Sequence, residues 1–331
     1  MQTDCCNCVV LLGPTAAGKT SLAVRLADRF GWDIISADSR QVYKGLDLGS
    51  GKDLDEYNAG GRQVPYHLID IATLHSEYNV FCFQQDFYRL FSQFQSQGKM
   101  PFAVGGSGMY ADSVIRGYEL LPVPENPRQK QELESHPLEE LGAMLLQLKP
   151  DLHNRSDLAD KARVIKALQI ELYKISPEGK KLRETLCSRP DIRPLVIGVT
   201  LERSQLYRNI EIRLRERLGK GLIEEVRQLH AEFPWERLEK LGLEYRYVSL
   251  YLEGKIQSRE EMERLLCRAI RQFAKRQETW FRGMERKGVD IHWLPREGGS
   301  EARFRSAVRL IESSVHPRHL RQALQPTPLS L

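Results

Sequence analysis

One segment near the start of the chain fits the phosphate-loop pattern G-x-x-x-x-G-K-[ST]: Gly13-Pro14-Thr15-Ala16-Ala17-Gly18-Lys19-Thr20. An apolar run precedes it, and apolar residues at helical spacing follow it, as this strand–loop–helix motif requires. Backbone N–H groups of such a loop cradle phosphate, and the lysine adds positive charge. The threonine hydroxyl can reach a bound Mg²⁺. The segment predicts a phosphate-bearing ligand, and ATP, GTP or a diphosphate ester would all fit.

Asp38 follows a second expected strand, residues 33–37, and would lie at the same sheet edge as the loop. A carboxylate there could act as a general base or bind Mg²⁺ through water. A capping or loop aspartate is the alternative, and position alone does not decide between them. Residues 105–108, Gly-Gly-Ser-Gly, follow another expected strand and open a helix at this edge. They offer either a second anion site or a close approach of the backbone to a substrate.

No later strand ends in the metal-binding aspartate that a nucleotide kinase or motor would normally have. The apolar run 195–199 ends in Thr200, and the run 102–104 ends in glycine. We therefore expect the loop to serve something other than hydrolysis of a nucleoside triphosphate.

The pattern of elements predicts an α/β fold, a P-loop NTPase-like parallel sheet core with an inserted all-helical domain. Strands are expected at 9–12, 33–37, 66–70, 101–104, 194–199 and 291–294. Helices are expected from about residue 19, at 79–97, 127–149 and 157–175, and within 203–287. The core would comprise residues 1–118 and 193–311, and the helical insertion residues 119–192. Residues 312–331 are expected to form a disordered tail.

Composition narrows the class of protein. The chain has 331 residues and a formal net charge of +5, and no apolar run approaches the roughly 20 residues of a membrane span. With no secretory pattern at the start, it is expected to be cytoplasmic and not bound to a membrane. Cys5, Cys6 and Cys8 are interpreted as small apolar residues entering a buried strand, because the other three cysteines form no second zinc-binding pair.

Basic residues crowd two segments, 203–227 and 264–287. Interleaved acidic residues are typical of solvated helix faces in both. The second segment also contains Phe273, Trp280 and Phe281, a mixture that suits phosphate contact and stacking on a nucleobase. Composition leaves both interpretations of the second segment open.

The chain resembles the tRNA dimethylallyltransferases (tRNA isopentenyltransferases) through some seven motifs, in order, between about residues 9 and 294. The matching segments are 13–20 (family GPTASGKT), 34–49 (ISADSxQVYKGMDIGT), 67–70 (HLID), 104–110 (VGGTGLY), 163–168 (RxxRAL), 210–226 (RIxxR…GLxxEV) and 275–282 (KRQxTWxR).

This resemblance implies an activity. The family transfers a dimethylallyl group from dimethylallyl diphosphate to N6 of the adenosine adjacent to the anticodon, position 37, and releases diphosphate. The implied substrates are tRNAs reading codons that begin with U, bound by the anticodon stem-loop. Mg²⁺ is the implied cofactor, and we expect a monomer.

The resemblance also implies roles for residues. The loop 13–20 would hold the diphosphate, with Lys19, Thr15 and Arg213 as catalytic residues, Asp38 as general base, and Thr20 at the metal. Contacts to tRNA are implied for Asp38, Ser39, Arg40, Gln41, Ser107, Lys130, Arg163, Lys166, Tyr245, Arg246, Lys275, Arg276, Gln277 and Trp280.

Three motifs depart from the family. The family's GTAKP reads Gly49-Ser50-Gly51-Lys52-Asp53, and its GYR reads Glu244-Tyr245-Arg246, which places a carboxylate near the expected RNA path. Its DPxxR reads Asn126-Pro127-Arg128-Gln129-Lys130, so either Arg128 or Lys130 could contact the tRNA.

Three other functions are considered. An adenylate isopentenyltransferase acting on free AMP, ADP or ATP would not need the helical insertion or the KRQxTWxR segment. An ATP-dependent small-molecule kinase would share the loop but would need the missing aspartate. An RNA-binding protein with a degenerate site is disfavoured by the intact Lys19, Thr20 and Asp38.

Overall fold

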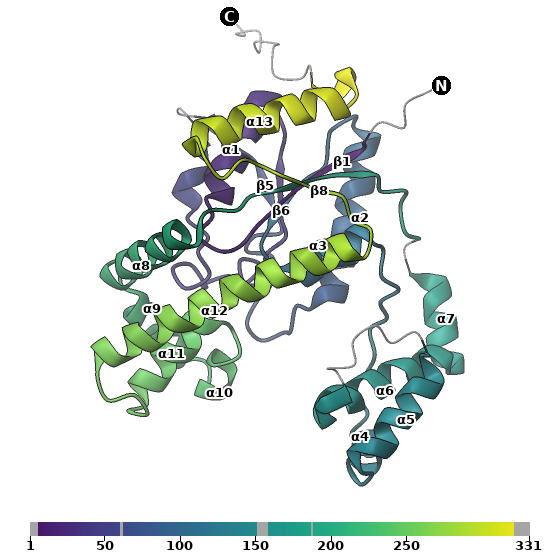
Figure 1. Ribbon diagram of the computed structural model, residues 1–331. Helices are drawn as coiled ribbons and strands as arrows, with labels where there is room; N and C mark the ends of the chain where they lie inside the picture. Colours follow the sequence, from purple (N-terminus) through teal and green to yellow (C-terminus); the bar gives the residue numbers. More distant parts are fainter. Residues whose placement is uncertain (1–5, 60–61, 151–157, 187, 321–331) are drawn as a thin grey trace, which may run out of the picture. The chain divides into compact units, whose positions relative to one another are not determined.

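The computed structural model describes residues 6–59, 62–150, 158–186 and 188–320 (Figure 1). The chain divides into two compact units. The core unit comprises Met1–Tyr118 and Pro190–Leu331, and the helical unit comprises Glu119–Arg189. Of the helices in the described ranges, none is long and apolar enough to cross a membrane.

A parallel sheet forms the centre of the core unit, with the strand order β5-β2-β6-β1-β7-β8 among the described residues. The strands are β1 (Cys8–Leu12), β2 (Ile34–Ser36), β5 (Tyr66–His67), β6 (Phe102–Gly105), β7 (Pro194–Gly198) and β8 (Ile291–Trp293). Val9 of β1 is in register with Phe102 on one side and Leu195 on the other. A separate antiparallel pair joins β3 (Asn58–Ala59) and β4 (Arg62–Gln63).

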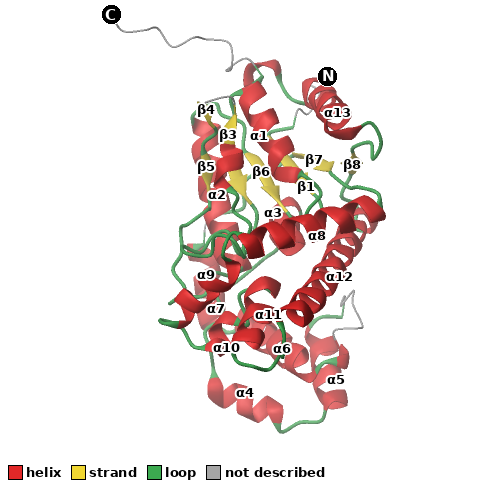
Figure 2. Cartoon of the chain, turned by 90° about the vertical axis from the view of Figure 1, so that its left-hand side faces the viewer, coloured by secondary structure: helices red, strands yellow, loops and turns green. Residues whose placement is uncertain are grey.

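Helices cover both faces of this sheet (Figure 2). The helices of the core unit are α1 (Lys19–Phe30), η1 (Leu54–Tyr57), α2 (Val80–Ser96), α3 (Gly108–Ile115), α8 (Arg203–Gly219), α9 (Leu222–His230), α10 (Trp235–Leu238), α11 (Leu243–Leu252), α12 (Arg259–Arg286), α13 (Gly299–Ser314) and η3 (Pro317–His319). Buried residues of α1 and α13 pack on one side of the sheet, and those of α2 and α3 on the other.

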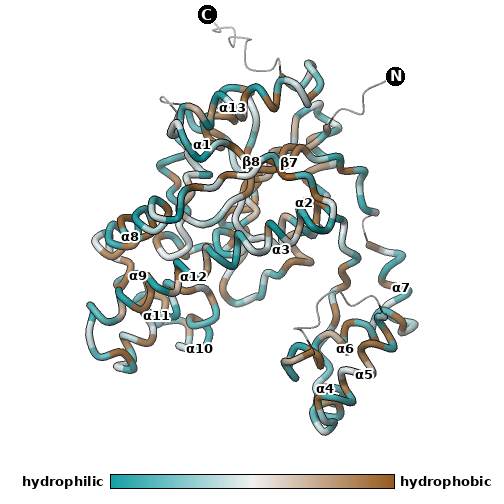
Figure 3. Tube along the Cα trace, viewed as in Figure 1, coloured by the Kyte–Doolittle hydropathy of each residue, from teal (hydrophilic) through white to brown (hydrophobic). Residues whose placement is uncertain are grey.

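Burial on both faces explains why the central strands are apolar throughout. Val9 and Leu11 point into one layer of the core, and Cys8, Val10 and Leu12 into the other. A strand covered on both faces needs apolar side chains at every position, and the strands are accordingly hydrophobic in Figure 3. Cys8 is fully buried, so its interpretation as a small core residue is confirmed. Cys5 lies outside the described residues.

The helical unit has its own small core. Its helices are α4 (Pro127–Glu134), α5 (Leu138–Leu148), α6 (Lys161–Ile175) and α7 (Pro177–Thr185). The buried residues that join α4, α5 and α6 are Leu133, Leu141, Leu145, Val164, Ile165 and Leu168. One helix was expected over 127–149, but α4 ends before Pro137, whose ring cannot continue a helix. The helix α7 was not predicted. Ser176 caps its N-terminus and Pro177 is its first residue.

The prediction of a disordered tail from residue 312 is wrong for residues 312–320. The helix α13 runs to Ser314, and Val315 is buried against the core. His319 is also buried, its ring bonded to the Gly98 carbonyl, and its own carbonyl accepts a hydrogen bond from the Trp32 indole. These contacts anchor the chain as far as residue 320, and residues 321–331 lie outside the described residues.

The aromatic stripe of α2 supplies a test of this packing. Phe87 is fully buried between α2 and the sheet, so Phe87→Ala should lower the free energy of unfolding by about 3–5 kcal/mol, because it leaves a cavity. Ser92 is exposed on the same helix, and Ser92→Ala should change stability by less than about 0.5 kcal/mol. Urea unfolding followed by circular dichroism measures both. Equal stability of the two variants would contradict this packing.

Candidate active site

The loop between β1 and α1 has the geometry of an anion cradle. Ala16 and Gly18 have positive φ values of 60° and 82°, which turn the chain back on itself before α1 begins. Gly13 lies against the Val199 carbonyl, where an added Cβ would be 2.3 Å from the oxygen, so only glycine fits there. The Lys19 Nζ donates to the Pro14 carbonyl across the loop at 2.7 Å. The predicted phosphate loop therefore has the expected shape.

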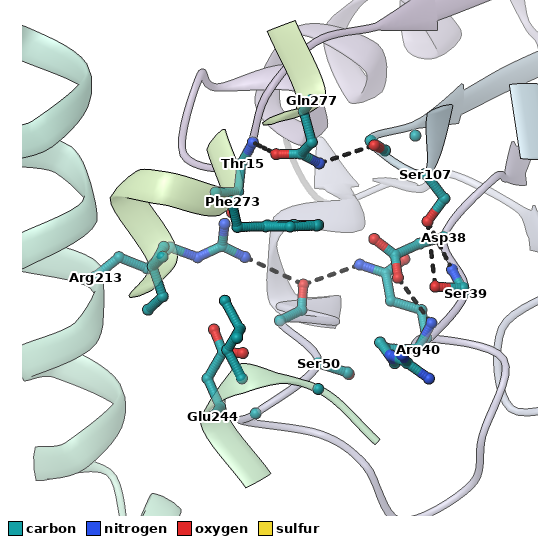
Figure 4. Close-up of a pocket in the computed structure, with 18 of the residues that line it drawn as sticks. Thr15, Asp38, Ser39, Arg40, Ser50, Ser107, Arg213, Glu244, Phe273 and Gln277 are labelled. Atoms are coloured by element: carbon teal, nitrogen blue, oxygen red, sulfur yellow. Dashed lines mark hydrogen bonds between the residues drawn. The ribbon is translucent and has the colours of Figure 1, made fainter. Parts of the chain in front are cut away.

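A pocket of about 410 Å³ opens beside this loop (Figure 4). It is lined from the loop, the ends of β2 and β6, and residues of α8, α11 and α12. The structure brings together in it the predicted site residues Thr15, Lys19, Thr20, Asp38, Ser39, Arg40, Gln41, Ser107, Arg213, Arg246, Arg276 and Gln277. Residues up to 262 positions apart in sequence thus meet at one sheet edge.

Lys19 is the loop's cation, and its pKa is lowered to about 8. Burial is the main cause, and the nearby Arg213 lowers the pKa further, whereas Asp38 raises it. Within the described ranges Lys19 forms no ion pair. An anion bound in the loop would therefore stabilise its charged form.

Asp38 is oriented by its own turn. Its Oδ1 accepts a hydrogen bond from the Arg40 N–H at 2.8 Å, a local arrangement that aspartate commonly makes after a strand. In the part of the chain that the structure describes, the carboxylate makes no other hydrogen bond, so Oδ2 is open to a ligand. The hydroxyl of Ser107 accepts from the Ser39 N–H at 3.0 Å and so joins this turn to the start of α3.

Gln277 of α12 links the loop to the end of β6. Its Oε1 accepts from the Thr15 N–H at 2.9 Å, and its Nε2 donates to the Gly106 carbonyl at 2.8 Å (Figure 4). The side chain is buried, with 7% exposed. Gln277 was expected among the tRNA contacts, but in this structure its amide fixes two walls of the pocket.

Arg213 of α8 lies on the opposite side of the pocket from Asp38 (Figure 4). Its Nη2 donates to Asp53 Oδ2 at 2.9 Å and to the Gly51 carbonyl at 3.4 Å. The same carbonyl accepts from Gln41 Nε2 at 3.0 Å, and Gln41 Oε1 accepts from the Ser36 hydroxyl at 2.9 Å. The wall formed by residues 49–53 is therefore tied to both α8 and β2.

Lys52, the lysine retained from the family's GTAKP, is buried behind this wall. Its Nζ donates to the Tyr43 carbonyl at 2.9 Å and to Asp47 at 2.7 Å, and it pairs with Asp70. The strand β5 ends at His67 instead of extending to residue 70 as expected, because the next residue, Leu68, has a φ of 60°, as does Asp70 with 55° further along. Buried lysines require such partners, and sequence alone did not identify them.

Other predicted residues lie outside the pocket. Tyr245, expected at the tRNA, is fully buried and donates to Glu225 at 2.7 Å, so it supports the wall from behind. Trp280 is partly exposed and lies against Gly108, where an added Cβ would be 2.4 Å from the indole. Lys275 is exposed on α12, and Lys130, Arg163 and Lys166 are exposed on the helical unit.

Phe273 lines the pocket, but it was not among the site residues predicted from the sequence. It lies on α12 with 38% of its side chain exposed, and its ring lies in the middle of the pocket in Figure 4. The basic-aromatic pattern of residues 271–282 was the signal that could have identified it.

Comparison with known proteins agrees with this geometry. Residues 41–284 match the family model described as IPP transferase. The chain is 52% identical to "tRNA dimethylallyltransferase 2" of Treponema denticola, over 87% of this chain and 95% of that protein. It is 48% identical to "tRNA dimethylallyltransferase 2" of Trichlorobacter lovleyi, over 92% and 96%.

A solved structure extends the likeness to the fold. The full-length tRNA isopentenylpyrophosphate transferase from Bacillus halodurans superimposes with a TM-score of 0.67 and 30% identity. The alignment covers 94% of this chain and 97% of that one. With the phosphate loop, Asp38 and Arg213 in one pocket, these matches over most of the sequence place the chain in the IPP transferase family, the family of the tRNA dimethylallyltransferases.

Proposed function

We propose that the protein transfers a dimethylallyl group from dimethylallyl diphosphate to N6 of adenosine 37 in tRNAs reading codons that begin with U, with release of diphosphate. One observation carries this proposal: an anion cradle and a carboxylate with an open oxygen face the same pocket. The names of the relatives support the reaction and the tRNA substrate. We expect the enzyme to act as a monomer in the cytoplasm.

The loop would hold the leaving group. When the bond between the allylic carbon and the diphosphate oxygen breaks, negative charge grows on the diphosphate, and positive charge spreads over the allyl carbons. Loop N–H groups, Lys19 and Arg213 would stabilise the growing negative charge, which lowers the barrier directly. Thr15, whose N–H is fixed by Gln277, would keep the loop in position.

Asp38 would act as the general base. The N6 amine of adenine is a weak nucleophile because its lone pair is delocalised into the ring. A carboxylate that accepts the N6 proton as the new carbon–nitrogen bond forms removes the charge that would otherwise accumulate. The open Oδ2 of Asp38 is suited to this step, because Oδ1 is held by the Arg40 N–H.

The residues present fit a Mg²⁺ ion that is bound largely by the substrate. Among the described residues, no three His, Cys, Asp or Glu side chains gather into a metal-binding group. Mg²⁺ commonly uses one or two protein oxygens together with phosphate oxygens and water. Thr20, which lines the pocket, would supply the protein oxygen. When bound, the ion would neutralise charge on the diphosphate.

The adenosine would enter the pocket out of the anticodon stack, because the reacting groups are recessed. Ser39, Arg40, Gln41 and Ser107 would hold the flipped nucleoside beside Asp38, and the exposed ring of Phe273 offers a stacking surface. Arg246, Arg276, Lys275 and Trp280 would contact the surrounding RNA, and Lys130, Arg163 and Lys166 would contact it from the helical unit.

A direct assay separates this function from its alternatives. The protein is incubated with dimethylallyl diphosphate, Mg²⁺ and either unmodified tRNA or AMP, and prenylated adenosine is detected by mass spectrometry. Product on tRNA is expected. Product only with AMP would indicate an adenylate isopentenyltransferase, and product with neither would contradict prenyl transfer.

Asp38 provides a test of the proposed mechanism. Asp38→Asn retains an oxygen for the Arg40 N–H but cannot accept the N6 proton, so kcat should fall by about 10²–10⁴-fold. Affinity for tRNA should remain within about threefold, because the turn is kept. Single-turnover kinetics and filter binding measure the two quantities. Near-normal turnover would show that another group is the base.

The lowered pKa of Lys19 provides a further prediction. In the free protein Lys19 loses its proton as pH rises through about 8, whereas a bound diphosphate favours the protonated form. Affinity for isopentenyl diphosphate, the isomer that lacks the reactive allylic ester, should be highest near pH 7, where Lys19 is protonated and the terminal phosphate, with a pKa of about 6, is largely ionised. It should fall above pH 8 by up to about tenfold per pH unit. Calorimetry between pH 6.5 and 9.5 measures this, and Lys19→Arg should remove the decline.

A further inference from the structure

Three residues that depart from the family motifs meet at the same two arginines. In the family's GTAKP, alanine and proline are replaced here by Gly51 and Asp53, and the glycine of GYR is replaced by Glu244. Asp53 Oδ2 lies 2.9 Å from Arg213 Nη2 and 3.3 Å from Arg217 Nη2. Glu244 Oε1 lies 3.7 Å from Arg217 Nη1. Two carboxylates absent from the family motif therefore pair with two guanidiniums.

Gly51 makes room for this arrangement. A Cβ added at Gly51 would lie 2.0 Å from Arg217 Nη2 and 2.3 Å from Arg213 Nη2. Gly51 also has a φ of 68°, which favours glycine. The alanine of the family motif would displace both guanidiniums from their present positions.

The backbone conformation of Asp53 also fits this arrangement of carboxylates and arginines. Its φ of 38° is unusual for a residue other than glycine, and it is incompatible with proline, whose ring fixes φ near −65°. The turn that carries the Asp53 carboxylate to the arginines therefore requires the loss of the family's proline. Gly51 and Asp53 fit this cluster through independent constraints, one of space and one of backbone conformation.

The electrostatics favour carboxylates beside these arginines. Burial raises the pKa of Glu244, and the neighbouring Arg217 opposes that shift. Arg217 has only 8% of its side chain exposed, and burial and the neighbouring Arg213 lower its pKa. Two adjacent guanidiniums repel each other, and removing them from water is unfavourable unless opposite charges lie close by. Asp53 contacts both guanidiniums, and Glu244 contacts the buried one on its other side. Glu244 lines the pocket on the same side as Arg213 (Figure 4).

We propose that Asp53 and Glu244 are positioning residues that hold Arg213, with the help of Arg217, in the orientation in which it meets the donor's diphosphate. This inference rests on the proposed function of Arg213. Asp53 acts on Arg213 directly, and Glu244 acts through Arg217. The cluster makes the affinity for the donor depend on residues that the donor itself does not touch.

The test compares donor binding with tRNA binding in Asp53→Asn, Glu244→Gln and the double variant. Titration with isopentenyl diphosphate and Mg²⁺ measures donor affinity without turnover, and steady-state kinetics give the KM for each substrate. Asp53→Asn should weaken donor binding and raise the donor KM by about tenfold, because the hydrogen bond from Arg213 then goes to a neutral amide and loses its charge assistance. The KM for tRNA should stay within about twofold. Glu244→Gln should have a smaller effect in the same direction.

Two further variants test the mechanism of positioning. Gly51→Ala should reproduce the loss of donor affinity, since its Cβ displaces both guanidiniums. The effects of Asp53→Asn and Glu244→Gln should combine to less than the product of the single effects, because both residues act on one pair of arginines. Asp53→Glu, which keeps the charge, should recover part of the affinity that Asp53→Asn loses.

Matched controls come from the same segments. Asp55 and Glu216 are exposed acidic residues near Asp53 and on α8, and neither takes part in an ion pair in the described chain. Asp55→Asn and Glu216→Gln should leave donor affinity and both KM values unchanged. Loss of donor affinity in these controls would mean that net charge, not position, is responsible.

Arg213→Ala separates this inference from the proposed function. If Arg213→Ala weakens donor binding while Asp53→Asn and Glu244→Gln bind the donor normally, the positioning role is wrong and the donor site stands. If Arg213→Ala also binds normally, the assignment of Arg213 to the diphosphate is wrong. Equal losses of tRNA and donor affinity in Asp53→Asn, with a lower melting temperature, would indicate a merely structural role and overturn the inference.

Discussion

Several cations share one recessed pocket, and the rest of the site depends on how their charge is balanced. Burial disfavours a charged side chain, and neighbouring cations repel, as the lowered pKa of Lys19 and the lowered pKa of Arg217 both reflect. The protein balances the two arginines with Asp53 and Glu244, and the buried Lys52 with Asp47 and Asp70. Among the described residues Lys19 forms no ion pair, so its charge is available to an external anion.

Sequence predicted the parts of the fold that depend on local patterns. The phosphate loop, the apolar central strands and the amphipathic α2 follow from residue spacing, because each is determined by its own backbone and by burial. The break between α4 and α5, the helix α7 and the anchored segment after Ser314 were missed. The anchored segment is held by Trp32 and Gly98, contacts that no local pattern contains.

The sequence predicted which residues belong to the candidate site better than it predicted what each of them does there. Gln277 and Tyr245 stand in motifs of the family, which suggested contact with RNA. Their side chains are buried. Gln277 joins two parts of the pocket wall that lie far apart in sequence, and Tyr245 donates to Glu225 behind the wall. A motif identifies a residue, but its partners decide what it does. In the same way, Gly51, Asp53 and Glu244 were visible only as departures until the structure placed them at the same arginines.

The separation of charges across the pocket has a chemical consequence. A prenyl transfer of the proposed kind needs a cationic side that receives the diphosphate and an anionic group that takes a proton a short distance away. If Asp38 were paired with an arginine, its carboxylate would be less available as a base. In the described chain Asp38 forms no ion pair, whereas Asp53 and Glu244 occupy the arginines on the opposite side. Within the described residues, therefore, the carboxylate proposed as the base and the two arginines are not paired with each other.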